Sequence, residues 1–282
     1  HIQSLLLEET ATLEEEEPPP PATQKPSPAP RPAKKRKGKM IACFSPTPEA
    51  GVTSLAVNLA LGLVVSLHIE VPLVELHPTQ TEMLPALHID PEPHRGNLRA
   101  TGERLNWDTL FLHLIDHPSG LRVLPAPPSG SDVPVSLTFQ AAALLRQKFP
   151  VTVFDTHHEL DARVKPVLMS SDVILMVTTP QVAAVRAMLE ASQSLRKWGY
   201  SERRILLVVN QVNADPEIPV KELSQGIKRP IFAVIPHEPA LPGLLQSGRP
   251  LLTSQPGSPA SQAIGRITMQ LVQGFKLAAL AR

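Results

Sequence analysis

The sequence predicts an α/β protein with a mostly parallel central sheet and helices on both faces. Short apolar runs alternate along the chain with longer segments whose apolar residues recur at helical spacing. The run Asp172–Pro180 is almost continuously apolar, as is typical of a strand buried on both faces of a parallel sheet. A third observation is a strand-loop-helix pattern near residue 40, which is typical of a phosphate-binding loop.

The alternating pattern places each element of this sheet. The expected strands are Met40–Phe44, Val71–Leu76, Leu121–Leu124, Val151–Thr156, Asp172–Pro180, Arg204–Asn210 and Ile231–Pro236. Helical spacing predicts helices from Thr53 onward, near Trp107–Leu114, and over Pro134–Lys148, Gln181–Lys197 and Ser258–Leu280. The apolar stripe of the last helix suits packing against the sheet and comprises Ile264, Ile267, Leu271, Phe275 and Ala278.

Composition excludes several classes of protein. A formal net charge of +1 over 282 residues gives no global attraction to nucleic acid or membrane. One cysteine, Cys43, forms no disulfide or zinc framework, fits a reducing compartment, and is expected as a buried core thiol. No apolar run is long enough to span a bilayer, and no spacing of Ser, His and Asp selects a catalytic triad.

Residues 1–39 have the composition of a linker rather than of a folded domain. Glu14–Glu17 is acidic, Pro18–Pro32 is rich in Pro and Ala, and the basic run Lys34–Lys37 continues to Lys39. We expect this segment to be extended and without a fixed fold, and residues 38–282 to form one domain. The basic run is either the solvated end of the linker or a contact for nucleic acid or anionic lipid.

The loop Ser45–Gly51 has the position of a phosphate-binding loop but lacks its chemistry. Such a loop reads G-x-x-x-x-G-K-[ST], in which the Lys reaches the outer phosphates and the Ser or Thr holds Mg²⁺. Val52 stands at the Lys position, Pro48 has no N–H to donate, and Glu49 adds a negative charge. One charge pair at about 4 Å is worth roughly 4 kcal/mol at an effective dielectric of 20. The loop therefore works against nucleotide binding.

The surrounding residues resemble the MinD/ParA family of deviant P-loop ATPases, specifically its CpaE/TadZ branch of pilus-assembly proteins. The segment Ser54–Ala60 reads SLAVNLA and is similar to the family's T-L-A-x-N-L-A helix. The string His117–Pro127 is similar to the branch's H-x-S-G-L-x-V-L-x-A-P. The family's signature Lys falls on Thr47 and its second Lys on Val52, so neither lysine is present.

The resemblance implies a nucleotide site with ATP or ADP and Mg²⁺. The residues that it places in this site are Gly51, Thr53, Ser54, Asp155 and Asn210, with Thr53 and Asp155 near the metal. Pro48, Glu49 and Val52 oppose this use of the loop. We therefore expect no catalytic residues, and weak or absent ATPase activity.

Two of the residues that the resemblance places in the site have a second interpretation. Asp155 ends a strand and is also suited to capping a turn, and Asn210 is also suited to a strand-to-loop turn. The family's D-x-D after the second strand is replaced here, with Glu75 and His77 at its two acidic places. His157 and His158 follow Asp155, but neighbours on a regular strand point to opposite faces, so we expect no metal site there.

Taken with the resemblance, these residues predict a MinD/ParA-type protein whose nucleotide site is degenerate. Its expected function is that of a positioning or assembly factor for a pilus or secretion machine. The expected partners are proteins of that assembly. A homodimer and a peripheral association with the membrane are compatible with the sequence. The expected location is the cytoplasm. One alternative is a working ATPase with a Lys supplied from elsewhere, such as Lys39. Another is a nucleic-acid-associated partition protein, whose binding would weaken steeply as salt rises.

Overall fold

The computed structural model describes residues 37–77, 83–90, 104–127 and 133–279. The eight strands are β1 (Lys39–Phe44), β2 (Val71–Leu76), β3 (Ile115–Asp116), β4 (Leu121–Leu124), β5 (Val151–Thr156), β6 (Val173–Thr178), β7 (Ile205–Val212) and β8 (Ile231–Pro236). They form one sheet in the order β3-β4-β2-β5-β1-β6-β7-β8. All neighbours are parallel except β3, which is antiparallel to β4. The predicted fold class is confirmed.

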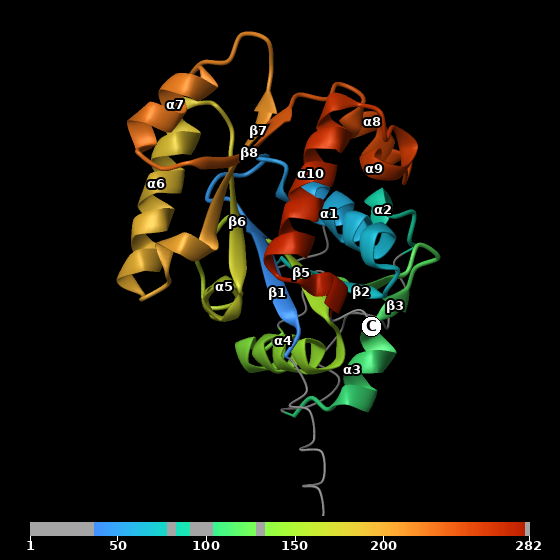
Figure 1. Cartoon of the computed structure of the whole chain (residues 1–282). Helices are drawn as coiled ribbons and strands as arrows, with labels where there is room; N and C mark the ends of the chain where they lie inside the picture. Colours follow the sequence, from blue (N-terminus) through green and yellow to red (C-terminus); the bar gives the residue numbers. More distant parts are fainter. Residues whose placement is uncertain (1–36, 78–82, 91–103, 128–132, 280–282) are drawn as a thin grey trace, which may run out of the picture. The chain divides into compact units, whose positions relative to one another are not determined.

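Helices cover both faces of this sheet (Figure 1). One face carries α1 (Val52–Leu67), α2 (Met83–Ala86), α8 (Leu241–Gln246), α9 (Leu251–Ser254) and α10 (Pro259–Gly274). The other carries α3 (Trp107–His113), α4 (Val135–Lys148), α5 (Val164–Ser170), α6 (Val182–Lys197) and α7 (Val220–Ile227). Short 3-10 turns occur at Glu202–Arg204 and Leu277–Ala279.

Strand alternation divides the core into two layers. In β1, Ile41 and Cys43 face the α1 side, whereas Ala42 and Phe44 face the opposite layer. This follows from the two-residue period of a strand, which sends successive side chains to opposite faces. All four side chains are fully buried, and Cys43 is the core thiol that the sequence predicts. Burial, followed by the charge of Asp155, raises the pKa of the Cys43 thiol well above its ordinary value.

The helix α1 is central because it is buried on several sides. It packs against α10 at Gly62, where a Cβ atom would lie 2.7 Å from the hydroxyl oxygen of Thr268. The side chain of Asn58 fixes this layer further. Its Oδ1 accepts a hydrogen bond from the Leu252 N–H (2.7 Å), and its Nδ2 donates one to the Ser54 carbonyl (2.8 Å). The start of α1 is therefore held in a defined position at the end of the sheet where the parallel strands finish.

Several sequence predictions require correction. The closing helix ends at Gly274 rather than Leu280, because Lys276 adopts a left-handed conformation with φ 54° that a helix cannot continue. Ala278 of the predicted stripe is exposed, and Leu277 is the buried residue of that turn. The strand expected to end at Asn210 continues to Val212.

Some elements were not predicted at all: β3, α2, α5, α7, α8 and α9. These are short, and a segment of one or two turns shows too little periodicity to be recognised. The predicted linker at residues 1–39 lies outside the described residues except for its last three positions. No helix within the described residues has the length and apolar character needed to cross a bilayer.

Candidate functional site

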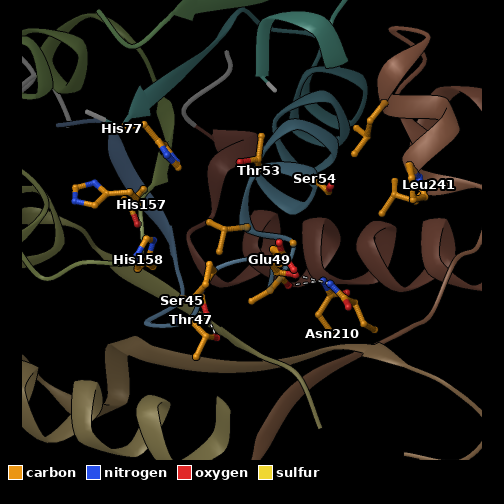
Figure 2. Close-up of a pocket in the computed structure, with 18 residues that line it drawn as sticks. Ser45, Thr47, Glu49, Thr53, Ser54, His77, His157, His158, Asn210 and Leu241 are labelled. Atoms are coloured by element: carbon orange, nitrogen blue, oxygen red, sulfur yellow. Dashed lines mark hydrogen bonds between the residues drawn. The ribbon is translucent and has the colours of Figure 1, made fainter. Parts of the chain in front are cut away.

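An open cavity of about 450 Å³ lies where the parallel strands end, at the loop that follows β1. In open α/β sheets this carboxyl edge is where ligands bind. Figure 2 shows the cavity with residues of five segments around it. The lining residues are Ser45, Thr47, Pro48, Glu49, Ala50, Gly51, Val52, Thr53, Ser54, His77, Thr156, His157, His158, Asn210, Gln211, Leu241, Pro242 and Leu245.

The loop between β1 and α1 turns sharply through two left-handed residues. Glu49 has φ 57° and Gly51 has φ 84°, and Gly51 immediately precedes α1. Glycine is needed at the second position for two reasons, because φ is positive and space is lacking. A Cβ atom at Gly51 would lie 2.3 Å from Nδ2 of Asn210. The backbone of the loop thus packs directly against the Asn210 side chain of β7.

The start of α1 retains free hydrogen-bond donors. In the described part of the chain, the backbone N–H groups of Gly51, Val52, Thr53 and Ser54 have no hydrogen-bond acceptor. The first intrahelical donor is Leu55, which bonds to the Gly51 carbonyl at 3.0 Å. Unpaired N–H groups and the positive end of the helix dipole favour an anion at this position. The loop has kept this part of anion-binding geometry although it has lost the lysines.

Two adjacent side-chain amides of β7 bind the backbone of the loop. Asn210 Nδ2 donates to the Ala50 carbonyl at 2.7 Å, and Gln211 Nε2 donates to the Glu49 carbonyl at 2.7 Å. Neighbours on a regular strand would face opposite ways. Here the pairing of β7 with β8 is irregular between Val209 and Val212, and Gln211 has φ 57°. This bulge turns both side chains toward the same loop, as bulges beside functional sites do.

Histidines form the other side of the cavity (Figure 2). His77 follows β2, and its Nε2 lies 3.8 Å from Oδ1 of Asp155. Burial alone lowers the pKa of His77, but the adjacent carboxylate of Asp155 and the charge of Glu75 raise it overall. His157 is fixed by its Nδ1, 2.7 Å from the Leu76 carbonyl, and by its Nε2, 3.3 Å from Oδ2 of Asp161.

The carboxylate of Asp155 is not among the groups that line this cavity. Its side chain is fully buried, and neither oxygen has a hydrogen-bond partner among the described residues. An orphaned carboxylate would suit a cation, yet the imidazole of His77 already occupies ion-pair distance. Within the described ranges, no group of three His, Cys, Asp or Glu side chains could hold a metal ion. The carboxylate that the family resemblance places near Mg²⁺ therefore faces an imidazole instead of an open coordination position.

The wall of the cavity carries neither lysine nor arginine among the described residues. Val52 occupies the first position of α1, where the P-loop lysine would stand. Lys39 lies at the opposite end of β1, where its Nζ is 3.3 Å from Oδ1 of Asp172 and stacks over the Phe275 ring. A strand of this length spans about 16 Å, so Lys39 is far from the loop.

The structure brings most of the predicted site residues together. Gly51, Thr53, Ser54 and Asn210 line the cavity, whereas Asp155 does not. The sequence alone did not indicate Gln211 or the lining residues of α8, which are Leu241, Pro242 and Leu245. A bulge and a short helix leave little signal in a single sequence. Sequence reasoning also missed His77 as a wall residue, although the loss of the second acid after β2 pointed to that position.

Comparison with known proteins agrees with this architecture. No family model matches the chain. An uncharacterized ATP-binding protein of Methanocaldococcus jannaschii is 28% identical over 106 residues, which is 37% of this chain and 39% of that protein. The chain thus spans about two-fifths of the length of this curated relative.

Solved structures match over much more of the chain. The septum site-determining protein MinD of Pyrococcus horikoshii, complexed with Mg-ADP, aligns with a TM-score of 0.73 and 20% identity, over 87% of this chain and 99% of that chain. A ParA family ATPase from Chlorobium tepidum aligns with a TM-score of 0.74 and 20% identity, over 82% and 98%. The chain therefore has the P-loop fold of the MinD and ParA ATPases.

Proposed function

We propose that this chain is a MinD/ParA-type protein that acts as a positioning or assembly factor of the pilus or secretion kind, with weak or absent ATP binding. The observation that carries the proposal is the start of α1, where Val52 replaces the lysine and the described wall holds no lysine or arginine. The fold is thus retained while the cations that a triphosphate needs are missing.

The magnitudes support this choice. Each missing cation–phosphate pair removes roughly 4 kcal/mol of attraction at about 4 Å and an effective dielectric of 20. Glu49 lines the cavity and is exposed, so it adds repulsion to an incoming phosphate. The free N–H groups at the start of α1 offer about 0.3–1 kcal/mol of dipole stabilisation for each charge, which does not offset these losses.

A working ATPase is the second candidate, because those same N–H groups preserve anion-binding geometry. The M. jannaschii relative is named for ATP binding, and the MinD neighbour carries Mg-ADP. The candidate needs a lysine from another source, and Lys39 is engaged with Asp172 at the far end of β1. We therefore place it second, with a lysine from a partner chain as its remaining route.

The expected partners are proteins, and the segment before the domain has the composition of a linker. We infer that residues 1–39 serve as a linker to the domain at 38–282, and that the function is exerted through protein contacts. A homodimer and peripheral association with the inner face of the membrane fit this role. The salt dependence of any nucleic-acid binding tests the partition-protein alternative, since phosphate contacts weaken steeply as salt rises.

Calorimetry with Mg-ATP and Mg-ADP tests the proposal directly. The full chain is compared with a variant that carries Pro48→Gly, Glu49→Gly and Val52→Lys. We expect no measurable heat for the native chain and clear binding by the variant, because the substitutions restore a donor, remove a repulsive charge and supply the cation. Micromolar binding together with ATP hydrolysis by the native chain would contradict the proposal and favour the ATPase.

A further inference from the structure

The strongest unexplained feature near the cavity is the carboxylate of Asp155. It ends β5, is fully buried, and has no hydrogen bond on either oxygen within the described residues. A buried carboxylate is unfavourable unless a partner compensates for its lost hydration. Nε2 of His77, 3.8 Å from Oδ1, is the one described group at ion-pair distance.

We propose that the imidazole of His77 is the permanent ion-pair partner of Asp155. It takes the place near this carboxylate where the family resemblance implies Mg²⁺. The carboxylate of Asp155 then needs no divalent metal as its partner. This inference rests on the proposed function, since it concerns the same degenerate loop, and it adds that the metal requirement has been lost together with the lysines.

The groups around His77 show that this partnership is specific. Glu75 on β2 lies opposite Asp155 on β5 in the strand register, but its Oε2 accepts a hydrogen bond from the Ala126 N–H at 2.8 Å. The ring of His157 is 5.9 Å from the ring of His77, and it already contacts Leu76 and Asp161. Glu75 and His157 thus have partners of their own, and Asp155 has His77.

The chemistry of Mg²⁺ explains why His77 and Mg²⁺ would exclude one another as partners of Asp155. Mg²⁺ requires six oxygen ligands in near-ideal octahedral geometry, and imidazole suits other metals better. His77 puts a nitrogen and a ring at the place where the resembling family has a second acid. The described residues also offer no set of three His, Cys, Asp or Glu side chains around a common point. A second carboxylate at position 77 would replace the imidazole with oxygen ligands beside Asp155.

Manganese binding by the full chain, measured by electron paramagnetic resonance without nucleotide, tests this inference. The wild type is compared with His77→Asp and with Asp155→Asn. We expect the wild type and Asp155→Asn to bind Mn²⁺ equally weakly, and His77→Asp to bind at least about tenfold tighter, because it brings two carboxylates together. Mn²⁺ binding by the wild type that Asp155→Asn weakens tenfold would overturn the inference.

A double-mutant cycle covers the case in which His77→Asp fails to fold. Melting temperatures are measured for the wild type, His77→Asn, Asp155→Asn and the double variant. If the two side chains are partners, Asp155→Asn lowers the melting temperature less in the His77→Asn background than in the wild type. Additive effects would show that the pair is not coupled. ATP hydrolysis by the wild type would contradict the proposed function, whereas these two experiments use no nucleotide and judge the His77–Asp155 pair alone.

Discussion

The side-chain amide of Asn210 donates a 2.7 Å hydrogen bond to the backbone carbonyl of Ala50, across 160 residues of sequence. This bond ties the end of β7 to the loop that precedes α1. Both residues are buried, so neither polar group can exchange the bond for one with water. The contact therefore fixes the loop in the absence of any ligand.

Asn210→Ala is expected to destabilise the protein by about 1–3 kcal/mol, because it leaves a buried carbonyl without a donor. Urea unfolding measures the loss, and hydrogen exchange at residues 50–54 should show faster opening of the loop. Gln211→Ala is the matched control, since its amide is exposed and its removal should cost about 0.5 kcal/mol or less. Equal losses in the two variants would show that burial does not decide the strength of this contact.

Gly51→Ala is expected to lower the free energy of unfolding by more than the cost of a left-handed alanine backbone alone. A left-handed alanine costs about 1–2 kcal/mol, and its Cβ would also displace the Asn210 amide, 2.3 Å away. In an Asn210→Ala background only the backbone cost should remain, so the two changes should combine less than additively. Urea unfolding of the four variants gives the coupling.

A second glycine provides the control for that cycle. A Cβ atom added at Gly243 in α8 would meet no heavy atom within 4 Å, so Gly243→Ala should be neutral or stabilising by up to about 1 kcal/mol. A loss at Gly243 as large as the loss at Gly51 would contradict the steric argument.

His117 should make the protein less stable in acid. Burial lowers the pKa of His117, although its bond to the Leu87 carbonyl partly offsets this effect. Its Nδ1 accepts from the Ser119 N–H at 3.2 Å, so a proton at that nitrogen would break the bond. The unfolded chain binds the proton at about pH 6.5, before the folded state does, so stability falls as pH drops below that value.

The variant His117→Gln should remove this acid sensitivity. Urea unfolding at about pH 7.5 and about pH 5 should show a smaller loss on acidification for the variant than for the wild type. An identical loss in both proteins would mean that His117 does not contribute.

His77 should have the opposite pH dependence. The pKa of His77 is raised overall, because the adjacent carboxylate of Asp155 and the charge of Glu75 outweigh the opposing effect of burial. The stability it contributes is therefore fully present below about pH 6.5 and is lost as pH rises through the folded-state pKa. His77→Asn should thus destabilise the protein more at about pH 6 than at about pH 9, as judged by urea unfolding. A greater loss at the higher pH would mean that the pKa is not raised.

Much of the fold followed from patterns that one sequence contains. The strands Val71–Leu76, Leu121–Leu124, Val151–Thr156 and Ile231–Pro236 have the predicted bounds, because short, mostly apolar runs flanked by turn residues mark buried strands clearly. The short helices α2, α8 and α9 could not be predicted, since one or two turns carry little periodic signal. Their contribution to the cavity wall and core became evident only from packing.

The sequence by itself determined the sheet, the position of the loop, and the loss of the lysine at Val52, because these depend on residue type and local order. Tertiary structure decided the contacts across the sheet. The bulge at Gln211 aims two amides at one loop, and parallel pairing brings β2 beside β5 so that His77 reaches Asp155. Such contacts join residues that are far apart in sequence, and only the folded chain places them within a few ångströms.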